Sequence, residues 1–190
     1  MGTVETAVVT FEDFLNLPNP PSGHLELHHG QVIVVPQRMH LHAEIQQALL
    51  ELLLPFTRGR GFLTNEFPFR APGHEAWQAD VGFVREDRRS EITDYLMGAP
   101  DLVVEVLSPS NTVDEISDKM DVCMANGCVS FWAVDPKRQV VSVTEGDLTR
   151  QYRASTSLPL PQPLEGAIAV GAIFERPVGL FEANQRPVPR

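Results

Sequence analysis

The hydrophobic and polar positions of this 190-residue chain follow two periods, one typical of strands and the other of helices. Apolar residues at every second position, or in short unbroken runs, predict strands, whereas spacings of three and four predict helices. In chain order the patterns predict a short helix over FEDFLNL, a hairpin over 24–35, a helix from Met39 to about Thr57, strands over 61–69, 77–84 and 101–107, a helix from Thr112 to Gly127, and strands over 129–135 and 139–143. This order predicts an α/β protein.

Length and composition favour one domain over residues 1–190, with a core over about 10–176 and loosely held ends at 1–9 and 182–190. We find neither an apolar run long enough to span a membrane nor a secretory signal pattern, so we expect a cytoplasmic protein. The two cysteines, Cys123 and Cys128, fit reduced thiols better than a disulfide framework. The net charge of −10 argues against a protein that coats nucleic acid through a broad basic surface.

One strand carries an acid where a core residue is expected. In DLVVEVL, strand parity places Glu105 on the same face as Val103 and Leu107. Burial of an unpaired carboxylate costs several kcal/mol, so the group must be neutralised, paired with a cation or bound to a metal. Asp80 poses the same problem in WQADVGFV, where the small Gly82 is expected to leave space beside its carboxylate.

If the strands of Asp80 and Glu105 are neighbours, the two carboxylates can share a hard cation such as Mg²⁺, which favours oxygen ligands and keeps several waters. Such a site suits phosphodiester hydrolysis. From the rise per residue, Lys119 lies about 10 Å from the start of the following helix. Glu105 lies about 10 Å before the end of its strand. A helix that returns along the strand therefore brings the ammonium level with Glu105, where it would orient the attacking water or stabilise the phosphate.

Four blocks of the sequence resemble the Uma-two family of restriction endonucleases, within the PD-(D/E)XK nuclease superfamily. They are LELHHGQ, ADVGFV, GAPDLVVEVLSPSNT and the segment from Lys119 to ANGCVSFWAVDP, and the resemblance runs from about Phe11 to Glu175. It implies a restriction-endonuclease-like fold, with a mixed central sheet flanked by helices, and a cofactor of Mg²⁺ or Mn²⁺. The implied function is hydrolysis of DNA by an endonuclease.

The resemblance also implies roles for matched positions. Asp80 and Glu105 correspond to metal ligands, Glu26 to an additional acid, and Lys119 to a lysine relocated from the position that Leu107 occupies. Besides Leu107, the chain departs from the family pattern at four positions: Ala79 stands where proline is usual, and His28, His29 and Gln31 stand where an Ile-Asp-Gly-Glu pattern is commoner.

Each candidate also has a structural interpretation. Glu105 alone would suit a buried acid paired with a basic residue, Lys119 a helix lysine extending to solvent, and Glu26 an exposed strand residue. Asp101 is expected at the surface where its strand begins, and His42 in the cleft near phosphate. We expect Arg85 and Arg88 on a solvated face, and Trp77 and Trp132 among core or strand residues.

A different class of function also fits the sequence. The acidic charge and the altered residues around Gly30 favour a catalytically silent nuclease fold that acts as a binding or assembly module. Either protein is expected to form a homodimer, through paired strands or the hairpin from Phe62 to Phe69. Metal binding at Asp80 and Glu105 separates the two functions, whereas dimer formation does not.

Overall fold

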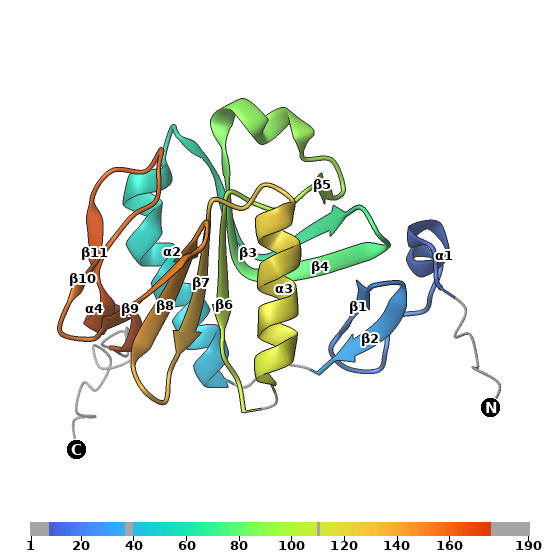
Figure 1. Cartoon of the computed structure of the whole chain (residues 1–190), viewed down its shortest axis with the longest axis horizontal. Coiled ribbons are helices and arrows are strands. Elements are labelled where there is room, and N and C mark those ends of the chain that lie inside the picture. Colours follow the sequence, from blue (N-terminus) through green and yellow to red (C-terminus); the bar gives the residue numbers. More distant parts are fainter. Residues whose placement is uncertain (1–7, 37–39, 110, 176–190) are drawn as a thin grey trace, which may run out of the picture.

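The computed structural model describes residues 8–36, 40–109 and 111–175 as one mixed sheet with helices on both faces (Figure 1). The helices are α1 (Phe11–Leu15), α2 (His40–Thr57), α3 (Val113–Ala125), α4 (Val170–Phe174) and a 3₁₀ turn, η1 (Glu86–Glu91). The strands of the large sheet are β1 (His24–His28), β2 (Gln31–Val35), β3 (Gly61–Ala71), β4 (Glu75–Arg85), β5 (Leu96–Met97), β6 (Leu102–Val106), β7 (Ser130–Asp135), β8 (Val140–Glu145) and β9 (Leu148–Arg153). A small second sheet pairs β10 (Ser157–Pro159) with β11 (Ala167–Ala169).

The large sheet runs in the order β2-β1-β4-β6-β7-β8-β9, with β3 paired to β4 and β5. Among its pairs, β6–β7 and β3–β5 are parallel and the others are antiparallel, so the sheet is mixed as expected. The apolar strand β6 lies at its centre and is buried along its whole length. Burial on both faces explains why its sequence is a continuous hydrophobic run rather than an alternating one.

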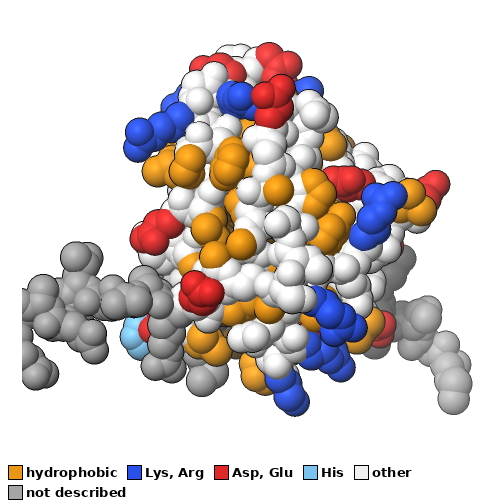
Figure 2. All heavy atoms as spheres, turned by 90° about the vertical axis from the view of Figure 1, so that its left-hand side faces the viewer, with side chains coloured by type: hydrophobic (Ala, Val, Ile, Leu, Met, Phe, Trp, Pro, Cys, Tyr) orange, Lys and Arg blue, Asp and Glu red, His pale blue; other side chains and the backbone are white. Residues whose placement is uncertain are grey.

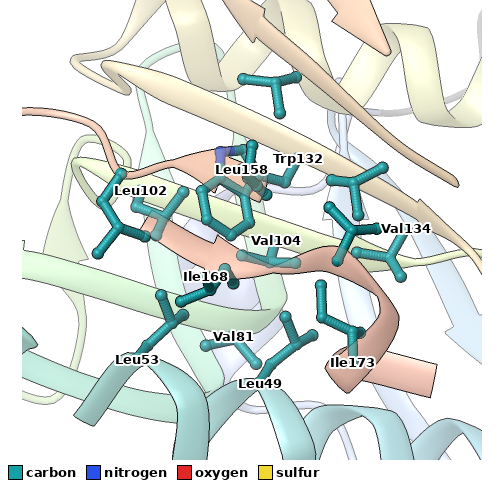
Figure 3. Close-up of a cluster of buried hydrophobic side chains, with 14 of the residues drawn as sticks. Leu49, Leu53, Val81, Leu102, Val104, Trp132, Val134, Leu158, Ile168 and Ile173 are labelled. Carbon is teal, nitrogen blue, oxygen red and sulfur yellow. The ribbon is translucent and has the colours of Figure 1, made fainter. Parts of the chain in front are cut away.

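The main core lies between α2 and the sheet. Ile45, Leu49 and Leu53, spaced by four residues, form the buried stripe of α2. This stripe packs against side chains of the central strands, and the segment from β10 to α4 closes the core on the same side (Figure 3). The labelled members from the strands and the closing segment are Val81, Leu102, Val104, Trp132, Val134, Leu158, Ile168 and Ile173.

Helix α3 covers the opposite face. Thr112 begins it with a capping box: the Glu115 N–H donates to Thr112 Oγ1 (3.2 Å), and the Thr112 N–H donates to Glu115 Oε2 (2.8 Å). Gly127, with φ of 104°, follows its end in a backbone conformation that favours glycine. The helix therefore begins and ends near the residues that the sequence indicated, which fixes the position of Lys119 along it.

In the middle of β4, the side chains of one alternating set switch from one face of the sheet to the other. Trp77 and Ala79 belong to the α3-side core, whereas Val81 and Phe83, in the same alternating phase, belong to the α2-side core. The change occurs at Asp80. Gly82, two residues on, has no room for a side chain, because a Cβ there would meet the Phe67 ring at 2.7 Å. The expectation that Gly82 leaves space beside Asp80 is therefore wrong, since Phe67 fills that space.

Asp101 was expected at the surface and is instead buried. Its carboxylate pairs with Arg85 Nε, at the end of β4, at 2.9 Å and with Arg88 Nη1, in η1, at 3.1 Å. Two cations compensate the burial of this acid, and one of them, Arg88, is itself mostly buried. Arg88 and Arg85 are therefore structural partners of Asp101.

The ends of the chain were expected to be loosely held, and most of them, residues 1–7 and 182–190, lie outside the described residues. Val9 is described, and its N–H donates to Gly30 O at 2.9 Å. Within the three described ranges, no helix combines the length and apolar character needed to cross a membrane.

The α2 stripe generates a test of the core. We expect Leu49→Ala to lower the free energy of unfolding by about 2–5 kcal/mol, because it removes a fully buried side chain and leaves a cavity. The matched control is Leu54→Ala on the same helix, where the side chain is 43% exposed and the expected cost is below about 1 kcal/mol. Urea unfolding followed by circular dichroism measures both, and equal losses would contradict this account of the core.

Candidate active site

One edge of β4 is open in the middle of the sheet. β3 pairs with β4 along nearly its whole length on one side. On the other side β1 pairs with β4 only at Ala76, and β6 pairs only from Val81 to Phe83. The backbone groups of Gln78 and Asp80 lie between these two contacts, in a buried place where polar groups need hydrogen-bond partners.

Charged side chains supply those partners. The Gln78 N–H donates to Glu26 Oε1 (3.1 Å), and the Gln78 carbonyl accepts from Lys119 Nζ (2.8 Å). The Asp80 N–H donates to Glu105 Oε1 at 3.3 Å. The open edge of β4 is thus closed by Glu26 from β1, Lys119 from α3 and Glu105 from β6.

Asp80 faces Glu105 across the gap. The register of β4 with β6, continued by one residue beyond Val81 and Val104, sets Asp80 opposite Glu105. Instead of a regular backbone pair, Asp80 Oδ2 accepts from the Val106 N–H at 2.7 Å. His42 Nε2 of α2 lies 3.1 Å from the same oxygen, and Gln46 Nε2 donates to the Asp80 carbonyl at 3.1 Å. Helix α2 therefore holds Asp80 from one side of the sheet.

Lys119 connects the acids from the other side. Its Nζ lies 3.0 Å from Glu105 Oε1 and 3.8 Å from Glu26 Oε1, and it is also 5.5 Å from the centre of the Trp77 ring. Burial alone would lower the pKa of Lys119, but the negative charges of Glu105 and Glu26 outweigh burial and raise this pKa above its ordinary value. Lys119 is therefore a buried ammonium, not a lysine that extends to solvent.

Glu26 is buried, contrary to the alternative of an exposed strand residue. His24 Nε2 and His28 Nε2, on the same face of β1, lie 3.3 Å and 2.7 Å from its two oxygens, and the His28 ring stacks on Trp77. Burial tends to raise the pKa of Glu26, but the charge of Lys119 and the contacts with both histidines lower it well below its usual range.

Three buried carboxylates thus converge with one buried ammonium. Among the described residues, Glu26 and Glu105 lie beside Lys119, and imidazoles from β1 and α2 contact Glu26 and Asp80. Sequence reasoning selected these four residues but gave His42 little weight and did not include His24, His28 or Gln46. The alternation HLELH, with three polar residues on one face, was the available signal, although it resembles an exposed strand face.

Comparison with known proteins assigns the chain to a family. A family model described as "Uma2: Putative restriction endonuclease" matches residues 11–177. The chain belongs to the Uma2 family. The match covers almost every described residue. It includes Glu26, Asp80, Glu105 and Lys119, which we call the acidic cluster.

A solved structure has the same fold as this Uma2 chain. The crystal structure of a "putative nuclease belonging to DUF820" from Anabaena variabilis superposes with a TM-score of 0.79 at 22% identity, over 87% of this chain and 97% of that one. The cryo-electron microscopy structure of a DrdV–DNA complex also matches, at 11% identity over 59% of this chain and 12% of that chain, but its TM-score of 0.33 is too low for any inference. No curated protein sequence matches the chain. The family and the fold together indicate a nuclease.

Nuclease families of this kind typically use divalent metals, and the acidic cluster fits one. Among the residues that the structure describes, no group of three or more His, Cys, Asp or Glu side chains forms a metal cage. Mg²⁺ does not need one, because it is usually held by one or two carboxylates together with waters and substrate phosphates. Asp80 and Glu105, whose strands lie side by side, are carboxylates of the kind that would hold such an ion.

His29 joins the two elements that carry Glu26 and Lys119. It lies in the turn of the β1–β2 hairpin, its Nδ1 is 2.6 Å from Glu75 of β4, and its Nε2 is 2.9 Å from Asp118 of α3. The hydrogen bond with Asp118 raises the pKa of His29. Burial opposes this effect, and the charges of Glu75 and Asp118 add to it. The imidazole therefore connects the hairpin, β4 and α3.

This contact predicts a pH-dependent contribution to stability. Because the pKa of His29 is raised above its ordinary value of 6.5 by folding, its contribution is complete below about pH 6 and disappears as the pH rises through the raised pKa. We expect wild type to exceed His29→Asn in free energy of unfolding near pH 6 by at most about 1 kcal/mol, because the imidazole is exposed, and by less near pH 9. Asparagine tolerates the positive φ of 49° at this position.

Urea unfolding of both proteins at the two pH values measures the difference. Asp118→Asn is the matched partner variant and should reduce the same pH dependence from the other side of the contact. A difference between wild type and His29→Asn that stays constant, or grows, towards alkaline pH would contradict this role of His29.

Proposed function

We propose that this protein is a divalent-metal-dependent endonuclease that hydrolyses DNA phosphodiester bonds with Mg²⁺ or Mn²⁺. The observation that supports the proposal best is the position of Asp80 opposite Glu105, with Lys119 Nζ 3.0 Å from the Glu105 carboxylate. Membership of the Uma2 family makes nucleic acid the substrate class to test first.

Asp80 and Glu105 are the proposed metal ligands. Both come from central strands whose backbones are fixed by their neighbours, and both carboxylates are already held, by Val106 and His42 at Asp80 and by Lys119 at Glu105. Residues held in this way lose little freedom when they bind an ion. A bound divalent cation would polarise a phosphoryl oxygen and lower the pKa of a coordinated water.

Lys119 and Glu26 complete the site. An ammonium has three N–H groups, of which Glu105 and the Gln78 carbonyl engage two in the part of the chain that the structure describes. We assign the third to a phosphate oxygen or to the attacking water, where a fixed positive charge stabilises the charge that develops in the transition state. Glu26 keeps Lys119 in place and adjusts the charge of the site.

His42 acts through Asp80. Its Nε2 contacts the same carboxylate oxygen that accepts from the Val106 N–H, so it restricts the orientation of that carboxylate. Its place on α2, beside the open edge of β4, makes it a positioning residue in the proposed mechanism.

Metal titration by calorimetry, combined with plasmid nicking on the same samples, tests the proposal. We expect the wild type to bind Mn²⁺ or Mg²⁺ and to nick plasmid DNA, whereas Asp80→Asn and Glu105→Gln lose both. The matched control is Glu51→Gln, an exposed acid of α2 that should change neither.

The outcomes separate the two functions that the sequence allowed. If the wild type binds no divalent metal, the nuclease proposal fails and the nuclease-fold binding module replaces it. Metal binding without cleavage of plasmid, linear duplex or single-stranded DNA also contradicts the catalytic assignment, because the bound ion would then not promote DNA hydrolysis.

Lys119 provides a separate prediction. We expect Lys119→Gln to retain metal binding, because the two proposed ligands remain, but to lower the nicking rate at least about a hundredfold, because the positive charge at the transition state is gone. A thermal melt of each variant checks that the lower rate is not caused by unfolding. An unchanged rate would restrict Lys119 to its structural hydrogen bonds.

A homodimer is the proposed working form, since a cleaver of duplex DNA with one acid cluster per copy needs two copies to cut both strands. Phe67 and Phe69 are buried within the α3-side core, so the strand from Phe62 to Phe69 is a poor dimer surface. The edge strand β2, where Val34 is 56% exposed, is the better candidate. Sedimentation velocity gives the oligomeric state directly.

A further inference from the structure

A pocket lies beside the acidic cluster, between α1 and the diverging strands β1 and β4. Its volume is about 220 Å³. The residues on which the inference rests are Phe14, Leu17, Asn19, His24, Gln78 and Tyr95. The pocket lies where β1 and β4 part, on the Gln78 side of the contact between Leu27 and Ala76, and Phe14 of α1 belongs to the same buried cluster as these two residues.

The pocket and the cluster share residues. His24 lines the pocket and lies 3.3 Å from Glu26, and Gln78 lines it while its backbone bonds both Glu26 and Lys119. If a DNA strand binds with one phosphate at the acidic cluster, a nucleotide next to that phosphate can therefore reach this pocket.

The walls have the chemistry of a site for a flat heteroaromatic ring. Phe14, Tyr95 and Leu17 give apolar and aromatic surface, while the Asn19 and Gln78 side chains are amides that can both donate and accept. Aromatic side chains stack on nucleobases, and amides recognise the hydrogen-bonding edges of bases. The volume is smaller than the pockets of drug-sized ligands, which start at about 300 Å³, so it suits one base.

The net charge of the protein explains why a contact with a base would help it to bind DNA. With a net charge of −10, the chain gains little general attraction for phosphate backbones. Figure 2 shows the side of the molecule that carries β9 to β11 and α4, away from the pocket, and there the Lys and Arg side chains stand in separate small groups among acidic and hydrophobic ones. Binding energy for DNA must therefore come in large part from contacts that do not depend on charge, and insertion of a base is such a contact.

We propose that this pocket binds one unstacked nucleobase of the DNA strand whose phosphate lies at Asp80 and Glu105. The substrate is then single-stranded or branched DNA, or a duplex from which one nucleotide is extruded. This inference rests on the proposed nuclease function and adds the state of the substrate to it.

Abasic scanning tests the pocket with a protein that cannot cut. Asp80→Asn is titrated by fluorescence anisotropy with a labelled single-stranded oligodeoxynucleotide, and with a series in which one abasic site moves along the strand. We expect an abasic site at one position, next to the phosphate that the wild type cuts, to weaken binding about tenfold, and abasic sites elsewhere to have small effects.

A variant that fills the pocket distinguishes base insertion from other contacts. Leu17→Trp, at a residue 38% exposed on the pocket rim, should remove the difference between the intact and the sensitive abasic strand without touching the cluster. Leu148→Trp, 58% exposed on β9 at the opposite edge of the sheet, is the matched control and should preserve that difference. Thermal melts confirm that both variants fold.

Equal affinity for intact and abasic strands overturns the base pocket, as does a position-specific loss that Leu17→Trp leaves unchanged. Failure of the nuclease proposal is read from different samples, the plasmid nicking and metal titration of the wild type. Suppose that the wild type nicks DNA with metal, whereas Asp80→Asn binds intact and abasic strands with equal affinity. This result would refute the base-binding pocket and leave the nuclease proposal standing.

Discussion

The structure depends on how the open edge of β4 is closed. β1 and β6 share this edge and leave a gap between Ala76 and Val81, so buried backbone groups have no strand beside them. Hydrogen-bonded water would fill such a gap at a surface, but here side chains of Glu26, Glu105 and Lys119 fill it. The same divergence of strands makes the gap, the acidic cluster and the neighbouring pocket, because each occupies space that a continuous sheet would have closed.

The buried acids of this fold differ in their partners. Asp101 pairs with Arg85 and Arg88, so two arginines offset its charge. Glu26, Asp80 and Glu105 lie at the open edge of β4, where the described residues that contact them include Lys119 and the imidazoles of His24, His28 and His42. The convergence of three acids at this edge, rather than their burial alone, is the reason that the proposed metal site is assigned to it.

Much of the fold was predictable because strong patterns specify it. The apolar run around Glu105, the capping box at Thr112 and the four-residue spacing in α2 each depend on local chemistry. The level of Lys119 beside Glu105 followed from the rises of a helix and a strand that run back along each other. Strand β9, LTRQYR, was missed because it is an edge strand with polar side chains on both faces and so has no hydrophobic alternation.

Other features depend on contacts between distant residues, which a single sequence does not carry. The face change at Asp80 interrupts the alternation of β4 without any insertion, so parity fails beyond it. Asp101 looked exposed because its arginine partners lie far from it in the sequence, at the end of β4 and in η1. Glu26 looked exposed because the polar His24 and His28 share its face. Here the histidines cover the acid instead of facing solvent with it.

The charged side chains that close the edge of β4 are needed for the folded sheet as well as for the proposed reaction. Active-site residues commonly cost stability, so a protein that abandons its reaction gains by replacing them. In this chain the loss of Glu26, Glu105 or Lys119 would leave buried backbone groups without partners. Selection for a folded sheet would therefore preserve these residues even in a descendant that lacked the proposed activity.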